Sequence, residues 1–155
     1  MNVQNKERIA KESGIPPLIR LSGSPNASVS VEVRARALAG PRACCEAPSP
    51  PCLAQAIAAL ANLAVNDSNE MLIAQLGGLE PILNAADTSN MDLQSQSARA
   101  LRNLSVNPAN QAKIRDLNGI PILEKLVKSE NERISQQANR ALVNLGFDHG
   151  GGHHK

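Results

Sequence analysis

Apolar side chains recur at helical spacing on three similar segments of the chain. In the last segment, steps of four, three, one and three residues place them on one helix face: Ile134, Ala138, Ala141, Leu142 and Leu145. The middle segment has the same steps: Leu93, Ser97, Ala100, Leu101 and Leu104. The interval from Ala59 to Ala100 is 41 residues, and that from Ala100 to Ala141 is 41 again. A period near 40 predicts a stacked array of helical units, none of which can bury its apolar face alone.

Each complete unit divides into three predicted helices. A short first helix is expected to end near Gly78 or Gly119, because glycine is common just past a helix end. Pro81 and Pro121 then stand near the start of a second helix, where a missing N–H is tolerated. A polar turn leads to the long third helix. The predicted helices are residues 5–12, 15–22, 54–65, 69–76, 79–86, 91–105, 110–117, 120–128 and 131–146.

The first unit is longer than the others. Residues 5–21 (NKERIAKESGIPPLIRL) align with residues 110–126, but 23 surplus residues follow, and setting aside residues 31–53 restores the period. Val29 then takes the apolar position of Leu93, so removing the insert is expected to raise the melting temperature. Two hypotheses remain open for it: a retained intron or gene-model error, and a surface loop of the kind that repeat arrays tolerate.

The predicted solenoid covers residues 5–146. Its units are 5–65 with the insert, 69–105 and 110–146, and residues 147–155 are predicted to be a flexible Gly/His tail. Its ends carry no polar capping repeat, which predicts some self-association through exposed apolar faces.

Several motifs together resemble the armadillo repeat family. They are the second helices GIPPLIRL and GIPILEKL, the glycine after each first helix, and third helices of the form Ala-Leu-x-Asn-Leu. HEAT repeats are the structural alternative, but they lack the short first helix and this asparagine. The resemblance implies an all-α, right-handed superhelix of three repeats whose third helices line a concave groove. It also implies that the third-helix asparagines hydrogen-bond the backbone of an extended partner: Asn62, Asn103 and Asn144.

The helical wheel favours a polar row beside these asparagines. An Asn amide offers both a donor and an acceptor, so it can hold a peptide bond without reading its side chain. The candidate partner-binding residues of the middle unit are Gln96, Arg99, Asn103 and Asn107, with Gln137, Arg140 and Asn144 in the last unit and Asn62 and Asn66 in the first. The alternative is a solvated polar face that recurs because the units are duplicates.

The residues one turn before the asparagines favour an acidic partner. Nuclear-import adaptors of this family have tryptophan there, whereas this chain has Ala58, Arg99 and Arg140. The pattern is more similar to β-catenin-like grooves, whose basic residues pair with acidic side chains.

Composition and motifs narrow the function classes. The net charge of +2 and an aromatic content of 1% argue against a nucleic-acid partner. No apolar run approaches transmembrane length. Three clustered cysteines predict a reducing compartment, the cytoplasm or the nucleus.

No arrangement typical of an active site, cofactor site or metal site stands out. Cys44, Cys45 and Cys52 lack a fourth ligand, and His149, His153 and His154 lie in the glycine-rich tail. The sequence therefore predicts a non-enzymatic protein-interaction module. The alternative is a fragment of a larger multi-repeat scaffold or ubiquitin-ligase-type protein with its other domains missing.

Overall fold

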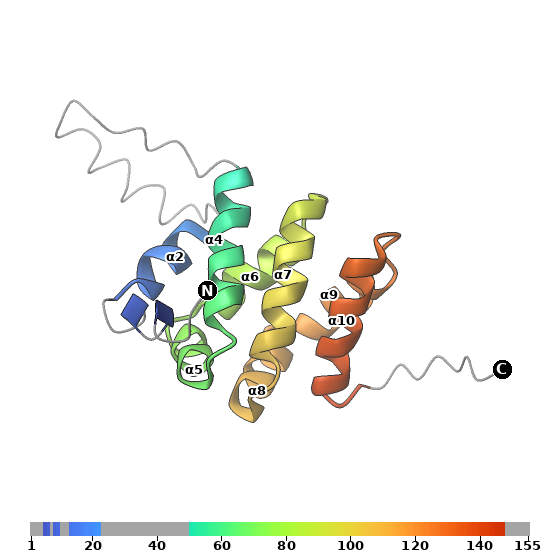
Figure 1. Cartoon of the computed structure of the whole chain (residues 1–155). Helices are drawn as coiled ribbons and strands as arrows, with labels where there is room; N and C mark the ends of the chain where they lie inside the picture. The colour runs from blue at the N-terminus through green and yellow to red at the C-terminus, as the bar shows by residue number, and fades with distance from the viewer. Residues whose placement is uncertain (1–4, 7, 10–12, 23–49, 148–155) are drawn as a thin grey trace.

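The chain folds into stacked helices (Figure 1). The computed structural model describes residues 5–6, 8–9, 13–22 and 50–147, and every regular element in these ranges is helical. The helices are α2 (Ile15–Ser22), α4 (Pro50–Leu63), α5 (Asp67–Gln75), α6 (Leu79–Ala86), α7 (Met91–Leu104), α8 (Pro108–Asp116), α9 (Gly119–Val127) and α10 (Glu132–Asn144). The prediction of an all-α repeat fold is confirmed.

Most predicted helix boundaries agree with the structure within two residues, and those of α2 and α6 coincide. The start of α4 was predicted four residues too late, because this helix begins at Pro50 inside the segment assigned to the insert. Two prolines are tolerated there, since the first N–H groups of a helix have no partner in it. Leu53 also packs against the core, so deleting residues 31–53 would remove a turn of α4. The predictions for Val29, residues 31–49 and residues 148–155 lie outside the described residues.

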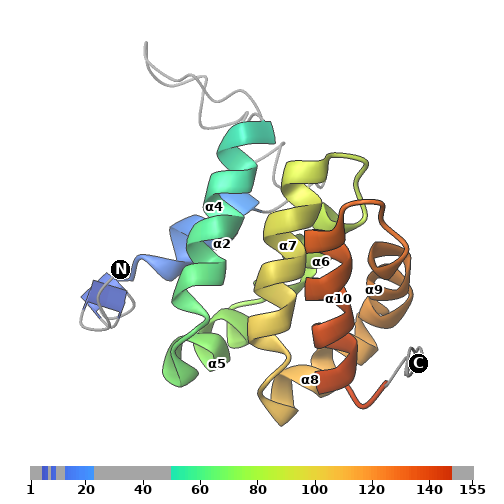
Figure 2. The same ribbon diagram turned by 45° about the vertical axis from the view of Figure 1, so that its right-hand side comes forward.

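The three third helices lie side by side. Figures 1 and 2 show α4, α7 and α10 in a row, and α7 packs against both of the others. The second helices α2, α6 and α9 pack behind them, while α5 and α8 lie at the end where the third helices finish. We call the surface formed by α4, α7 and α10 the third-helix face. Within the described residues, no helix is both long enough and apolar enough to cross a membrane.

The core lies between the layer of third helices and the layer of second helices. The large side chains that are fully buried come from both layers and from the first helices: Ile15, Ile57, Leu60, Leu63, Ile73, Leu79, Ile82, Leu101, Leu104, Ile114, Leu123 and Leu126. Alanines of the third helices are also buried, as at Ala100 and Ala141, which have no exposed surface. The predicted apolar stripes therefore face the core.

Gly78 and Gly119 are needed for a reason that the sequence did not indicate. The left-handed backbone at the end of each first helix is at Gly77 and Asn118, not at the next residue. At Gly119 a Cβ would lie 2.6 Å from Ile114 Cγ2 and 2.8 Å from Ile114 O, and Gly78 has the same environment beside Ile73. A side chain is excluded there by close packing of the second helix on the first.

Candidate functional site

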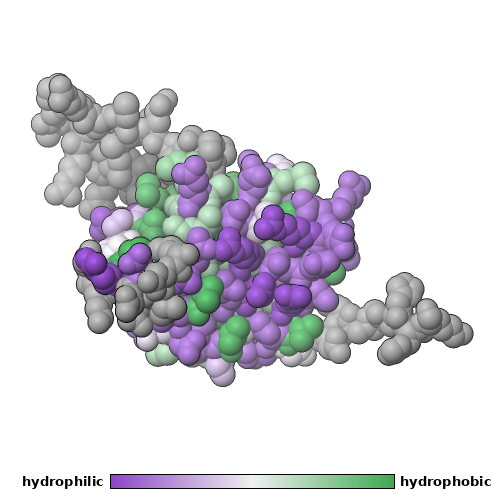
Figure 3. Space-filling view, viewed as in Figure 1, coloured by the Kyte–Doolittle hydropathy of each residue, from purple (hydrophilic) through white to green (hydrophobic). Residues whose placement is uncertain are grey.

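The predicted asparagine row lies on the third-helix face. Asn62, Asn103 and Asn144 occupy the last turn of α4, α7 and α10, and all three side chains are half-buried. Seen as in Figure 1, this side of the molecule is largely hydrophilic over α7 and α10 and more apolar over the alanine-rich α4 (Figure 3).

Each asparagine is bonded to a neighbouring third helix. Asn103 Nδ2 donates to the Ala61 carbonyl of α4 at 2.8 Å. Asn144 Nδ2 donates to the Arg102 carbonyl of α7 at 3.3 Å and to the Ser105 hydroxyl at 3.0 Å. The Arg102 carbonyl also accepts from the Ser105 hydroxyl at 2.9 Å. Carbonyls in the last turn of a helix have no backbone partner within it, and these amides donate to them and so join successive units. The sequence did not indicate this structural role.

One end of each carboxamide remains available. The Oδ1 atoms of Asn103 and Asn144 accept no hydrogen bond within the described part of the chain. Asn62 is the reverse, because its Oδ1 accepts from the Arg99 guanidinium while its Nδ2 has no partner among the described residues. The orientation of Asn103 and Asn144 is set by their carbonyl partners, because only the nitrogen of a carboxamide can donate a hydrogen bond. Together the three side chains can offer two acceptors and one donor to a bound main chain.

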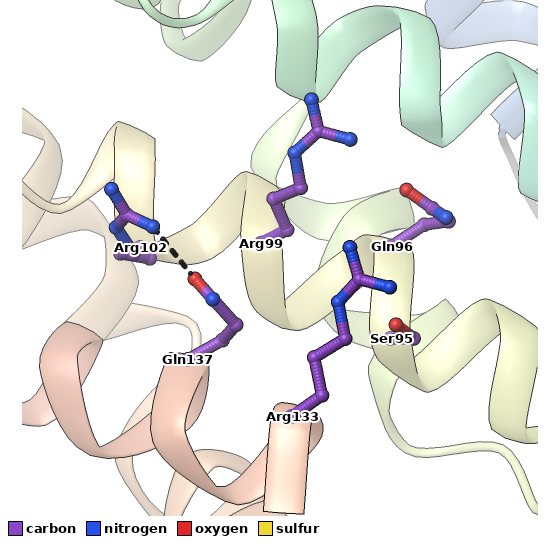
Figure 4. Close-up of a pocket in the computed structure, with 6 residues that line it drawn as sticks. All are labelled: Ser95, Gln96, Arg99, Arg102, Arg133 and Gln137. Atoms are coloured by element: carbon purple, nitrogen blue, oxygen red, sulfur yellow. Dashed lines mark hydrogen bonds between the residues drawn. The ribbon is translucent and has the colours of Figure 1, made fainter.

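Gln96, Arg99 and Gln137 are brought together around one cavity between α7 and α10 (Figure 4). Three further lining residues were missed in the sequence: Ser95, Arg102 and Arg133. Arg102 was detectable as the residue three positions after Arg99 on the same helix. The place of Arg133 depends on how α10 is rotated against α7, for which the sequence has no signal. Arg140 is exposed on α10 and does not line the cavity.

Asn66 and Asn107 are N-cap residues in the structure. Asn66 is the N-cap of α5 and accepts from the backbone N–H groups of Ser68 and Asn69 at 3.1 and 3.2 Å. Asn107 caps α8 through Ala109 N–H at 2.9 Å. An asparagine directly before a first-helix turn is the usual sequence signal for such a cap. We therefore leave these two residues out of the proposed binding surface.

A buried carboxyl lies beside one of these caps. Glu70 of α5 is buried, and this burial raises the pKa of its carboxyl above the ordinary value of 4.5. A hydrogen bond with the Asn107 side chain acts in the opposite direction, and Asp67 adds a smaller upward effect on that pKa. Glu70 is not bonded to Asn62, Asn103 or Asn144, and its burial bears on stability.

The described residues offer no metal centre. No group of three or more His, Cys, Asp or Glu side chains is placed to hold an ion in these ranges. Cys52 is an exposed free thiol. Cys44, Cys45, His149, His153 and His154 lie outside the described residues.

Comparison with known proteins identifies the repeats. The Armadillo/beta-catenin-like repeat family matches residues 66–106 and 107–147. A solved engineered protein superposes with a TM-score of 0.71 at 25% identity, covering 92% of this chain and 30% of that one. Computationally designed armadillo repeat proteins for modular peptide recognition superpose with a TM-score of 0.72 at 21% identity, with coverages of 92% and 51%.

A designed armadillo repeat protein in complex with the peptide (KR)4 superposes with a TM-score of 0.72 at 20% identity, with coverages of 93% and 52%. The chain thus spans about half the length of these structures or less. At such identities the last two matches establish the fold alone. No match is found among curated protein sequences.

Proposed function

Since the chain belongs to the armadillo/β-catenin-like repeat family, we propose that it is a non-enzymatic module that binds an extended, acidic segment of a partner protein on the third-helix face. The observation that carries the proposal is the row of Asn62, Asn103 and Asn144. Each is held by a neighbouring helix at one end of its carboxamide and is available at the other.

The spacing of the row suits an extended main chain. Packed helices lie roughly 8–10 Å apart, and a strand rises about 3.3 Å per residue, so one asparagine meets every third residue or so. The Oδ1 atoms of Asn103 and Asn144 would accept N–H groups of the partner, and Asn62 Nδ2 would donate to a carbonyl. Because these contacts involve only the backbone of the partner, they set its register and do not select its side chains.

Charge on the same face supports an acidic partner. Arg99 is half-buried and directed toward Asn62, while Arg140 stands at the equivalent position on α10 and is exposed. Neither forms an ion pair within the described residues. Guanidinium groups without a carboxylate partner attract Asp and Glu side chains and repel Lys and Arg.

The proposal is tested by fluorescence anisotropy with two labelled degenerate peptide libraries, one rich in Asp and Glu and one rich in Lys and Arg. The wild-type chain is expected to bind the acidic library more tightly. Asn103→Ala should weaken this binding by about 5–150-fold, the equivalent of roughly 1–3 kcal/mol for an unpaired polar group. The matched control is Asn139→Ala on α10, whose side chain forms no hydrogen bond within the described part of the chain.

A reversed-charge variant tests the selection of acidic side chains. Arg99→Glu combined with Arg140→Glu should slow association with the acidic library and weaken its dependence on salt. Preference of the wild type for the basic library would refute the charge assignment. Equal affinities for wild type and Asn103→Ala would show that the asparagine row is only a product of repeat duplication and its packing.

A further inference from the structure

Three arginines from two neighbouring third helices surround a cavity of about 220 Å³ on the third-helix face (Figure 4). Arg99 and Arg102 come from α7, and Arg133 comes from the first turn of α10. In Figure 4 the Arg133 side chain extends toward the space between Arg99 and Gln96, and the Arg99 side chain points toward α4, where it donates to Asn62. The rest of the lining is Ser95 and Gln137.

The arginines of this cavity form no ion pair within the described part of the chain. None of the six lining residues is acidic. Arg99 and Arg102 donate to the neutral oxygens of Asn62 and Gln137, the latter at 2.9 Å. The Arg133 side chain makes no hydrogen bond or ion pair within the described residues. A cation in the first turn of a helix is also disfavoured by the helix dipole, so Arg133 does not serve the stability of α10.

Repeat duplication does not account for the cluster. The positions 41 residues earlier lie at the equivalent interface, between α4 and α7. The glutamines of the cavity recur there as Gln55 and Gln96. The three arginines do not recur, because their counterparts are Ala58, Ala61 and Asp92. The positive charge is therefore confined to the interface of α7 with α10, as expected for a site that recognises one group of a ligand.

We propose that this cavity binds the phosphorylated side chain of a serine or threonine in the partner segment. The inference rests on the proposed function, since the same segment would follow the asparagine row. A phosphoryl group carries a charge of about −1.5 to −2 and three acceptor oxygens, and guanidinium groups bind it in pairs of parallel hydrogen bonds. The cavity is smaller than the roughly 300–1,000 Å³ of pockets for drug-sized ligands, which suits a single side-chain head group.

Gln96 offers an acceptor that a phosphorylated peptide can satisfy. Its Oε1 is buried and has no hydrogen-bond donor in the described part of the chain. The phosphoryl group of a phosphoserine dianion has only acceptors, so a donor for this oxygen must come from another part of the ligand. A peptide brings a backbone N–H beside its phosphoryl group and can satisfy both the glutamine and the arginines.

The test uses three labelled degenerate peptide libraries that differ only at a fixed central position, which is phosphoserine, glutamate or serine. The phosphoserine library is expected to bind the wild-type chain at least about tenfold more tightly than the glutamate library, since a dianion engages more than one guanidinium. Arg133→Ala should remove this advantage and leave the serine library unaffected. The Arg133 side chain is exposed and makes no hydrogen bond or ion pair among the described residues, so this variant is expected to fold.

A double variant and its charge control accompany it. The double variant Arg99→Ala/Arg133→Ala is compared with Arg20→Ala/Lys128→Ala, which removes two exposed charges elsewhere. Only the first should lose the preference for phosphoserine. Circular dichroism of each variant shows that the helices are retained.

Several outcomes would overturn the inference. Equal affinity for the phosphoserine and glutamate libraries, together with weakening of both by Asn103→Ala, would leave the proposed function standing and reject the phosphate site. Failure of all three libraries to bind would reject both. Competition by inorganic phosphate alone at the affinity of the phosphoserine library would identify a free-anion site. Arginine-dependent binding to vesicles that contain phosphatidylinositol phosphates, without binding to the peptides, would identify a membrane ligand.

Discussion

Removing the Asn103 side chain is expected to destabilise the free protein, before any partner is present. Its Nδ2 atom donates at 2.8 Å to the Ala61 carbonyl in the last turn of α4, where no intrahelical N–H is available. A hydrogen bond of this kind contributes about 0.5–1.5 kcal/mol net, and an unsatisfied half-buried carbonyl adds to the loss. Helix propensity acts in the other direction, because alanine is favoured over asparagine in a helix by roughly 0.5 kcal/mol.

The two effects give a net loss for Asn103→Ala of about 0.5–1.5 kcal/mol. For a chain of this length, each kcal/mol shifts the melting temperature by about 2–4 °C. The measurement is urea and thermal unfolding followed by circular dichroism, with Asn139→Ala as the control. Asn139 lies on α10 and has no hydrogen bond within the described residues, so its replacement should leave stability unchanged or raise it.

The sign of the change in the free energy of unfolding shows whether the bond to Ala61 stabilises the protein. If Asn103→Ala is as stable as the wild type or more so, the bond to Ala61 makes no contribution and the third helices are joined by apolar packing alone. A loss in both variants would point to a general effect of the substitution.

Three further changes test the packing. Gly119→Ala should destabilise by about 1–3 kcal/mol, since the new Cβ would lie 2.8 Å from the Ile114 carbonyl oxygen; an unchanged melting temperature would show that the contact relaxes freely. Ser97→Ala should stabilise by about 1 kcal/mol in urea unfolding, because the Ser97 hydroxyl is buried without a partner and both equivalent positions are alanine; a loss would mean that the hydroxyl is satisfied in solution. Glu70→Gln should raise the free energy of unfolding at neutral pH. Burial raises the pKa of this carboxyl in the folded state above 4.5, so stability present below that pH is lost as pH rises through the folded-state pKa. The advantage of the glutamine should therefore shrink in unfolding curves measured below pH 4.5, and an advantage independent of pH would contradict this cause.

Helical spacing and the repeat period were sufficient to predict the arrangement of the two complete units. The start of α4 was missed because Pro50 and Pro51 were interpreted as part of a loop, although the first turn of a helix accepts them. Asn107 was placed in the binding row by extending the helical wheel beyond Leu104, where α7 ends and the chain turns into the cap of α8. A helical wheel predicts side-chain positions only within one continuous helix.

The sequence predicts those features of the candidate site that depend on a single helix. The asparagines follow from the repeat, because equivalent residues of stacked units fall in one row. The partners of those asparagines on the preceding helix, and the position of Arg133 beside Arg99, depend on the rotation and offset of neighbouring helices. Those quantities are set by packing between units and leave no periodic signal in the sequence.

Binding on the third-helix face is tested most directly by an amide-correlation NMR titration of the isotope-labelled chain with the acidic peptide library. The largest shifts are expected in α4, α7 and α10, including the side-chain carboxamide signals of Asn62, Asn103 and Asn144. Signals of α6 and α9, which pack behind this face, should change little. Saturable shifts confined to α6 and α9, with the three carboxamide signals unmoved, would contradict peptide binding by the asparagine row.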